Sequence, residues 1–228
     1  MLKTMLQHYN QGDLLKAEEI ALGLDQEDPQ VMEVLERLEL IRRWNEGGRD
    51  LDFSEPKSWD YMPKFQKALD VIEKHKPFIK APVLDVGCFT GYFLRHYPSE
   101  SIKCGVDIHN ELMKWINSKS PCNYSFQFCK AEDVHRMFKH DYFEVVTMFD
   151  VLEHCLDDEE AVASVMKVLK PKGLLVIHLP RNDIYPDTSH EHLRIYTPES
   201  VEKLIPGIEI SECTDELGQP TIFGVKVK

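Results

Sequence analysis

The chain has 228 residues, of which 43% are hydrophobic, so it can bury the core of one α/β domain and carry a small additional element. Its 39 acidic and 27 basic residues give a formal net charge of −12 at pH 7. This acidity argues against a broad surface for nucleic acid or for an anionic membrane, because phosphate groups require a positively charged footprint. The hydrophobic content also argues against a disordered chain.

The cysteines and the first residues indicate an intracellular protein. The six cysteines form no C-x-x-C pair and several lie in apolar runs, which is typical of reduced thiols in a cytosolic core. The opening MLKTMLQHYN lacks the continuous apolar segment of a signal peptide, and no window reaches the roughly 18 apolar residues of a membrane span. We therefore expect a soluble, cytoplasmic protein.

Residues 1–45 are expected to form an N-terminal helical hairpin. Apolar residues recur at spacings of three and four in LLKAEEIALGL and VMEVLERLELIRRW, and Pro29 between them suits a helix start. The stretch YNQGDLLKAEEIALGLDQEDPQVMEVL resembles a single tetratricopeptide-type hairpin, with Gly12 and Asp13 at its turn and Ala17 in its first helix. One such unit cannot bury both faces, and no second copy follows. We expect an appendage that packs on the chain or docks a protein partner.

Residues 46–79 are expected to be a linker followed by a lid-like helix. EGGRDLDFSEPKS is polar and contains two glycines and a proline, whereas WDYMPKFQKALDVIEKHKPF has a helical pattern. From residue 82 onward, helix-like segments separate most of the short apolar runs PVLDVG, IKCGVDI, YSFQFCKA, FEVVTMFD and GLLVIHLP. This alternation predicts a parallel sheet, and the closely spaced runs IEISECTD and TIFGVKVK predict an antiparallel hairpin at the sheet edge.

The first strand ends in a turn that is suited to holding a ligand. In VLDVGCFTGYF the apolar run leads into residues 87–91, and a helix start follows. Glycine lets the backbone approach a ligand closely, a helix start offers unpaired N–H groups, and open α/β sheets bind ligands at such strand ends. The dinucleotide pattern G-x-G-x-x-G fails, because only Gly87 fits it. The nearby carboxylate of Asp85 suits a cationic ligand and would repel a pyrophosphate.

Five motifs in this order resemble those of the class I S-adenosylmethionine-dependent methyltransferases. They are DVGCFTGYF, VDI, AED, FDVLEH and LKPKGLLVIHLP, and the match spans residues 80–228. The resemblance implies an α/β, Rossmann-like domain with a mostly parallel seven-stranded sheet and an antiparallel C-terminal hairpin. It also implies S-adenosylmethionine as cofactor and S-adenosylhomocysteine as product.

Phe89 stands where the family pattern has its middle glycine. If the backbone geometry of the family holds, Phe89 must avoid positive φ, because side chains disfavour that region. Its ring either packs under the following helix, which we favour, or covers the methionine part of the ligand.

By the same resemblance, the cofactor lies at the ends of the first four strands. Asp107 would accept hydrogen bonds from both ribose hydroxyls, or else cap the helix that follows. Asp85 would contact the methionine ammonium, directly or through water, or order the loop. Glu132 and the Ala131 backbone would meet the adenine, with Lys130 where the family often has an aspartate. The full expected set is Asp85, Gly87, Cys88, Phe89, Gly91, Asp107, Ile108, Ala131, Glu132, Phe149 and Asp150, the last two flanking the sulfonium and the transferred methyl.

Histidines after the fourth and fifth strands are candidates for deprotonating an acceptor. His154 lies in DVLEH, and His190 and His192 lie in HEHLRIYTPES. Both segments open onto the same sheet edge, so His154 and His192 can meet near the methyl group as catalytic base or substrate contact. This arrangement resembles small-molecule methyltransferases of the quinone-biosynthesis type. The alternative for each histidine is a hydrogen-bonded surface group. Thr197 and Pro198 provide a strong helix-start signal nearby.

The same segments are also compatible with a metal-binding site. Asp150, Glu153, His154 and His192 resemble the Glu-x-x-Glu-His and later His with which small-RNA 3′-terminal 2′-O-methyltransferases hold a divalent ion. Mixed carboxylate and imidazole ligands suit Mg²⁺ or Mn²⁺ only moderately, and the net charge disfavours an RNA surface.

The expected function is methyl transfer to oxygen or nitrogen of a small-molecule, glycan-attached or carrier-bound acceptor. The alternatives are a non-catalytic, cofactor-binding interaction module, a metal-assisted RNA 2′-O-methyltransferase and a protein methyltransferase. A nicotinamide dehydrogenase is disfavoured by the failed glycine pattern. The sequence does not identify the acceptor. Four aromatic residues in the least patterned segments are candidates for an acceptor pocket or lid: Trp59, Tyr61, Tyr185 and Tyr196.

Overall fold

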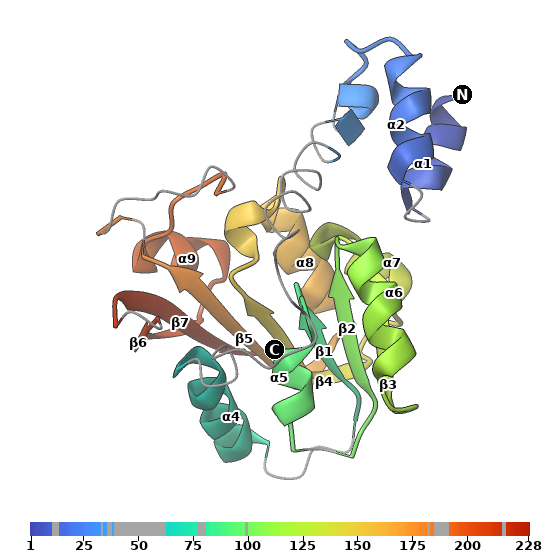
Figure 1. The fold of residues 1–228 in the computed structure, drawn as a ribbon. Helices are drawn as coiled ribbons and strands as arrows, with labels where there is room; N and C mark the ends of the chain where they lie inside the picture. The colour runs from blue at the N-terminus through green and yellow to red at the C-terminus, as the bar shows by residue number, and fades with distance from the viewer. Residues whose placement is uncertain are drawn as a thin grey trace.

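The computed structural model describes residues 1–10, 14–32, 34–35, 38, 63–76, 81–98, 100–181, 183–184, 192–215 and 218–228. Within these ranges seven strands form one mixed sheet in the order β3-β2-β1-β4-β5-β7-β6 (Figure 1). The strands are β1 (Val83–Val86), β2 (Lys103–Asp107), β3 (Tyr124–Phe128), β4 (Phe143–Phe149), β5 (Leu169–Pro180), β6 (Glu209–Thr214) and β7 (Pro220–Val227). The helices of this part are α4 (Pro63–His75), α5 (Tyr92–His96), α6 (Asn110–Lys119), α7 (Val134–Met137), α8 (Asp158–Val168) and α9 (Pro198–Leu204), with short 3₁₀ turns η2 (Ala131–Asp133) and η3 (Leu152–His154).

Strand order in the sheet reverses between β1 and β4. These two strands pair in parallel, with Val83 opposite Val145 and Val86 opposite Met148. From β1 the chain runs outward through β2 to β3, and from β4 it runs the other way to β5. The carboxyl ends of β1 and β4 are therefore the point at which an open α/β sheet binds its ligand.

The last two strands confirm the predicted antiparallel hairpin. β7 pairs with β5, with Val176 opposite Val225, and β6 pairs only with β7, which places it at the edge of the sheet. The sheet is thus mostly parallel, seven-stranded and Rossmann-like, as expected.

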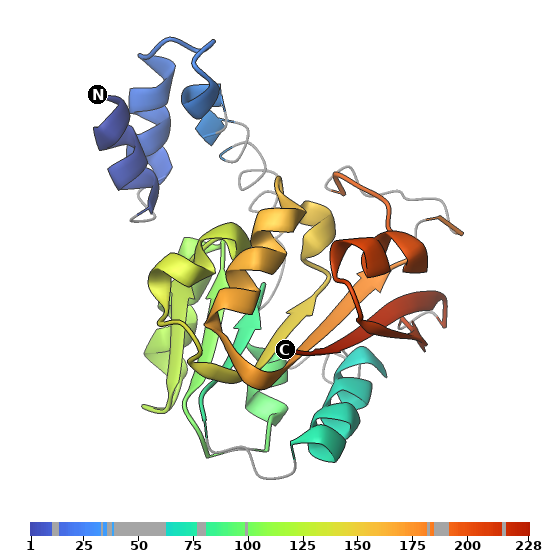
Figure 2. The same ribbon diagram turned by 180° about the vertical axis from the view of Figure 1, so that it is seen from behind.

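Helices cover both faces of the sheet, as the two opposite views show (Figures 1 and 2). Neighbouring residues of a strand point to opposite faces, so Val83 and Leu84 belong to different cores. Leu84 lies in the core that α7, α8 and α9 complete, and Val83 lies in the core that α4, α5 and α6 complete. Each face is closed by helices, which is why β1 and β4 are almost entirely apolar.

α4 confirms the helix predicted within residues 46–79. It starts at Pro63, which suits the first turn of a helix, and it buries Ala68 and Ile72 against the sheet. The predicted linker and the candidate pocket residues Trp59, Tyr61 and Tyr185 lie outside the described residues, whereas Tyr196 is buried in the core.

The described N-terminal residues form helices with a small core of their own. α1 (Leu2–Asn10) packs on α2 (Leu14–Leu22), Ala17 is fully buried, and a helix starts again at Pro29, as predicted. The predicted turn at residues 12–13 lies outside the described residues. Ile108, at the end of β2, packs against this N-terminal core.

The cysteines are reduced, as their spacing in the sequence predicted. All six cysteines are free thiols, and all but Cys122 are buried. No helix in the described ranges is long and apolar enough to cross a membrane.

Candidate active site

The turn after β1 places three residues in the left-handed region: Gly87 at φ 69°, Phe89 at φ 45° and Gly91 at φ 71°. The expectation that Phe89 avoids positive φ is therefore wrong. Two contacts offset the strain of roughly 1–2 kcal/mol that a side chain incurs there. The N–H of Phe89 donates a 2.9 Å hydrogen bond to Asp107 Oδ2, and its ring packs against the core that contains Phe93. The favoured packing role of the ring is confirmed.

Protein atoms, in addition to φ, exclude side chains at the two glycines of the turn. A Cβ on Gly87 would lie 2.3 Å from Cγ2 of Val151, and one on Gly91 would lie 2.7 Å from the ring of Phe126. We expected these glycines to make room for a ligand. In the structure they also make room for β3 and for the residue that follows Asp150.

The other polar groups of the turn differ in whether they are already hydrogen-bonded within the protein. The N–H groups of Gly87 and Cys88 both donate to the Val106 carbonyl, at 2.8 and 3.0 Å. The thiol of Cys88 is buried 3.8 Å from Met113 Sδ, so only its backbone can face a ligand. The hydroxyl of Thr90 is buried without a partner among the described residues. An unsatisfied buried hydroxyl costs about 1–3 kcal/mol, which a bound group can relieve. We had not singled out Thr90 from the sequence.

Asp107 joins the turn to the start of α6. Its carboxylate accepts from the N–H of Phe89 at 2.9 Å and from the N–H of His109 at 3.0 Å. The alternative role of Asp107 as helix cap is wrong, because His109 caps α6 by accepting from the N–H of Leu112. Burial raises the pKa of Asp107, and the two backbone hydrogen bonds oppose this rise.

Asp85 is a buried carboxyl with a pKa close to neutral. It is 3% exposed on β1, and burial raises its pKa to about 7. The hydroxyl of Thr147 on β4 donates a 2.6 Å hydrogen bond to it, which lowers the pKa, as does the charge of Lys64, whereas Asp107 raises it. A cation that binds near Asp85 will favour its ionised form.

The turn after β3 is the 3₁₀ turn η2, in which Ala131 and Glu132 are buried. Lys130, which replaces the family's usual aspartate, forms an ion pair of 2.9 Å with Asp133. A pocket of about 210 Å³ opens beside this turn. It is smaller than the roughly 300–1,000 Å³ of typical ligand sites, so it cannot hold a whole nucleoside cofactor.

The end of β4 carries a polar network that we had not predicted. Asp150, at φ 53°, accepts a hydrogen bond from His178 Nδ1 at 2.6 Å and forms an ion pair with Lys64 of α4. His178 Nε2 lies 2.9 Å from the hydroxyl of Thr221 on β7. Burial raises the pKa of Asp150, but His178 and Lys64 outweigh this effect and hold it well below its usual range. Phe149, before it, packs edge-on against Phe65 and Phe93 at ring-centroid distances of 5.1 and 5.0 Å.

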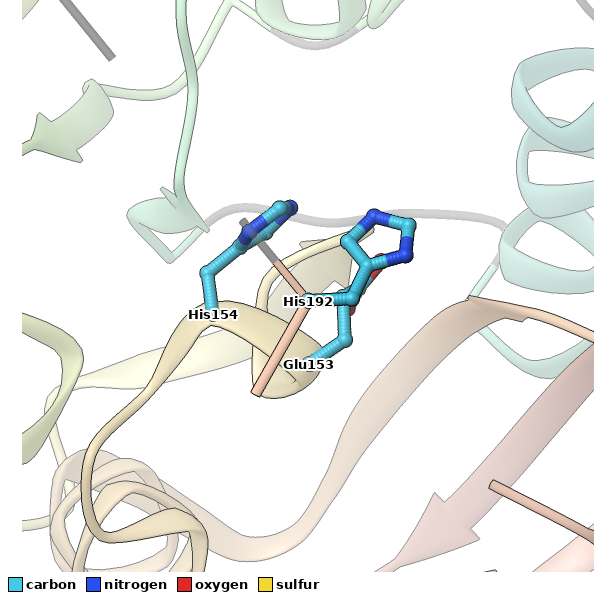
Figure 3. Close-up of side chains that lie close together, drawn as sticks. All are labelled: Glu153, His154 and His192. Atoms are coloured by element: carbon cyan, nitrogen blue, oxygen red, sulfur yellow. The ribbon is translucent and has the colours of Figure 1, made fainter. Parts of the chain in front are cut away.

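Glu153, His154 and His192 form a cluster beyond the end of β4 (Figure 3). The rings of His154 and His192 lie 4.9 Å apart, edge to face, so the predicted meeting of these two histidines is confirmed. One ligand atom from each of the three side chains lies within 4.8 Å of the others, which makes them candidate ligands for a metal ion. Asp150 is not part of this group, because it pairs with Lys64 and His178 instead. His190 lies outside the described residues.

Residues 193–196 fasten the segment of His192 onto η3. The N–H of Leu193 donates to the Glu153 carbonyl at 2.8 Å. Arg194 donates to three carbonyls around η3, and Tyr196 donates to Asp158 at 2.6 Å. The carbonyls that Arg194 contacts belong to Leu152, Cys155 and Leu156. α9 then begins at the predicted start, with Thr197 as cap and Pro198 at the first position, and Ser200 completes a capping box that we had not predicted from the sequence.

Comparison with known proteins agrees with this geometry. Residues 84–177 match the family model described as a methyltransferase domain, and this stretch contains the turn after β1, Asp107, η2 and η3. The chain contains a class I S-adenosylmethionine-dependent methyltransferase domain. Its cofactor is S-adenosylmethionine, which carries a sulfonium and an ammonium cation and a ribose diol. The acidic groups of Asp85, Asp107 and Asp150 and the unsatisfied hydroxyl of Thr90 fit such a ligand.

Curated relatives of this methyltransferase domain are distant. The chain is 22% identical over 182 residues to a ubiquinone biosynthesis O-methyltransferase of Neisseria meningitidis, covering 71% of this chain and 76% of that protein. A 54-residue stretch is 44% identical to the highly reducing polyketide synthase bet1 of Neocamarosporium betae. It covers 23% of this chain and spans only 2% of that much longer protein.

Solved structures share the fold of the methyltransferase domain. A protein of Pyrococcus horikoshii OT3 superposes with a TM-score of 0.60 at 19% identity, over 80% of this chain and 99% of that one. A SAM-dependent methyltransferase of Aquifex aeolicus gives a TM-score of 0.57 at 14% identity, over 77% and 98%.

Proposed function

We propose that this chain transfers the methyl group of S-adenosylmethionine to an oxygen or nitrogen of a small-molecule, glycan-attached or carrier-bound acceptor. The cofactor supplies a methyl group activated on its sulfonium. The observation that carries the proposal is the pairing of His154 and His192, 4.9 Å apart, beside the strand end that carries Asp150. The O-methyltransferase of Neisseria meningitidis, with its 22% identity, supports a small-molecule acceptor.

The residues at the strand ends divide the binding of the cofactor among them. Asp107 binds the ribose hydroxyls, and Asp85 binds the methionine ammonium. Ala131 and Glu132 border the adenine, and Phe149 and Asp150 flank the sulfonium. Support comes from the burial of Asp85 and Glu132, since a buried carboxylate gains most from a cation or from hydrogen-bond donors. The backbone of residues 87–91 and of Ile108 shapes the cradle around them.

His154 acts on the acceptor as general base. As the bond from the acceptor to the methyl carbon forms and the carbon–sulfur bond breaks, the acceptor's proton passes to the imidazole. An imidazole suits this step because its ordinary pKa lies near neutrality. His192, edge to face with His154, orients the ring or contacts the acceptor. General-base catalysis of this kind typically contributes about 10²–10⁴-fold.

A second candidate function is metal-assisted methyl transfer, in which the same cluster binds a divalent ion. One carboxylate and two imidazoles, with ligand atoms within 4.8 Å of one another, suit a divalent transition metal better than Mg²⁺. In that case Glu153, His154 and His192 would hold the ion, and the ion would polarise the acceptor oxygen. Neither imidazole would then act as base. The RNA acceptor that we considered from the sequence gains no support, because the chain carries a net charge of −12.

A screen of hydroxylated and aminated acceptors for formation of S-adenosylhomocysteine tests the proposal. We expect His154→Ala to lose at least about 100-fold in turnover while cofactor affinity stays within threefold. His140→Ala, at an exposed position, is the matched control. Unchanged turnover in His154→Ala would refute the catalytic role. A folded, cofactor-binding protein with no acceptor in a broad screen would favour the interaction module instead.

The same assay separates the base from the metal ion. Full turnover after exhaustive chelation assigns His154 as base. Turnover that is lost on chelation and restored by one divalent ion, with His192→Ala insensitive to that ion, assigns the metal site.

The division of the chain into residues 1–45, 46–79 and 80–228 also remains a proposal. It is supported by the separate core of the N-terminal helices, to which Met5 and Ala21 belong. We propose that these helices dock a protein partner. A cytoplasmic location accords with the buried free thiols.

A further inference from the structure

Lys64 brings a positive charge from α4 to the end of β4. It lies in the first turn of the helix, and its ammonium forms an ion pair with Asp150. The same charge also lowers the pKa of Asp85. One lysine thus partly neutralises two of the carboxylates that the proposed function assigns to the cationic end of the cofactor.

The packing of α4 fixes this lysine in place. Phe65 packs against Phe149 and Phe93, with ring-centroid distances of 5.1 and 5.9 Å, and Ala68 and Ile72 are buried behind it. The side chain of Lys64 is itself only 13% exposed. Because the side chain of Asp150 is 32% exposed, the contact between them is a partly buried ion pair, held by the packing of α4.

We propose that Lys64 determines the preference of the cofactor site between S-adenosylmethionine and S-adenosylhomocysteine, by competing with the sulfonium for Asp150. This inference rests on the proposed position of Asp150 beside the methyl group. The two ligands share the adenosine and the amino-acid end, and they differ in the methyl group and its positive charge. A lysine at Asp150 opposes that charge, whereas it is indifferent to the neutral thioether of the product.

Asp150 remains a carboxylate without Lys64, because His178 donates to its other oxygen at 2.6 Å. Removing the lysine therefore leaves a partly exposed negative charge with one partner fewer. That charge then becomes available to the sulfonium, and S-adenosylmethionine gains affinity relative to its product.

Lys67 offers a matched control on the same helix. It bonds to the carbonyl of Glu212 on β6 and lies over the ring of Phe223 at 4.8 Å, away from Asp150. Lys67→Met makes the same change in net charge and side-chain shape as Lys64→Met, without touching the proposed sulfonium partner.

The test is calorimetric titration of both ligands into wild type, Lys64→Met, Lys64→Arg and Lys67→Met. We expect the ratio of the Kd for S-adenosylhomocysteine to the Kd for S-adenosylmethionine to rise at least fivefold in Lys64→Met. It should stay within twofold of wild type in the other two variants. If Lys64→Met does not fold by circular dichroism, Lys64→Gln takes its place under the same criterion.

An unchanged ratio in Lys64→Met, or an equal rise in Lys67→Met, overturns the inference while leaving the methyltransferase proposal intact. Failure of wild type to bind either ligand overturns both. Because the quantity measured is a ratio, a general loosening of α4 that weakens both ligands equally does not imitate the expected result.

Discussion

The hydroxyl of Thr147 on β4 donates a 2.6 Å hydrogen bond to the carboxyl of Asp85 on β1. This contact joins the two strands where strand order in the sheet reverses, at residues directly opposite each other in the register. The contact is buried between two largely apolar strands, and burial raises the pKa of Asp85 to about 7. The carboxyl that we assign to the cofactor's ammonium therefore changes its charge near neutral pH.

Cofactor affinity should depend on pH through Asp85. A cation near this group favours its ionised form, so binding at pH below about 7 releases a proton from Asp85. We expect the Kd for S-adenosylhomocysteine to fall as pH rises from 5.5 to about 7, by at most roughly tenfold per unit, and then to level off. Titration calorimetry in buffers of different ionisation enthalpy measures the released proton directly.

Two variants check that this proton belongs to Asp85. Asp85→Asn should remove the pH dependence. Thr147→Val removes a hydrogen bond that lowers the Asp85 pKa, and should move the dependence to higher pH. A proton release that is unchanged in Asp85→Asn would assign it to another group.

Asp107→Ala should weaken the binding of both cofactor forms at least tenfold, about 1.4 kcal/mol. The carboxylate supplies the proposed acceptors for the ribose, and it also holds the N–H groups of Phe89 and His109. Calorimetric titration gives the affinity, and thermal unfolding shows the structural part of the loss. Glu202→Ala removes the same charge from an exposed position on α9, and it should leave the affinity for both cofactor forms unchanged. Equal affinity in Asp107→Ala and wild type would contradict the ribose assignment.

Gly91→Ala should destabilise the fold by about 2–4 kcal/mol, since it combines a strained φ with overpacking. The added Cβ would lie 2.7 Å from the ring of Phe126. Gly218→Ala is the matched control, because Gly218 has φ 79° but nothing within 4 Å of the added atom. Gly218→Ala should lower the free energy of unfolding only through the strained φ, by about 1–2 kcal/mol. Urea unfolding of both variants separates the contribution of the strained φ from that of overpacking. Equal losses of stability in the two variants would mean that Phe126 moves aside at no cost.

Phe89 allows a direct measurement of backbone strain in the ligand turn. Phe89→Gly and Phe89→Ala both delete the ring, but only glycine accepts φ 45° without penalty. We expect the glycine variant to be more stable than the alanine variant by about 1 kcal/mol, and both to be less stable than wild type. The urea concentrations at which Phe89→Gly and Phe89→Ala are half unfolded measure this difference. An alanine variant at least as stable as the glycine variant would show that the turn relaxes.

The sequence predicted what depends on patterns within one element. The apolar runs predicted all seven strands and the hairpin, and the signal at Thr197 and Pro198 predicted the start of α9. The meeting of His154 and His192 followed from the rule that parallel strand ends share one edge.

Contacts between side chains of different elements could not be predicted in this way. The network of Lys64, Asp150, His178 and Thr221 draws its members from α4, the end of β4, β5 and β7. One signal was present: His178 interrupts the apolar run GLLVIHLP, and a buried imidazole requires partners. The positive φ of Phe89 had no such signal, because it is imposed by the hydrogen bond to Asp107 and by packing.

The position of β7 between β5 and β6 has a consequence for the order of folding. β6 precedes β7 in the chain but pairs with β7 and not with β5, so β6 can join the sheet only through β7. Until β7 pairs with β5, β5 is an open edge, and His178 lacks the hydroxyl of Thr221 that lies 2.9 Å from its Nε2. The polar environment of Asp150 is therefore complete only once β7 has paired with β5. A nascent chain with β1 to β4 already paired would have a sheet but not yet the electrostatic field of the mature site.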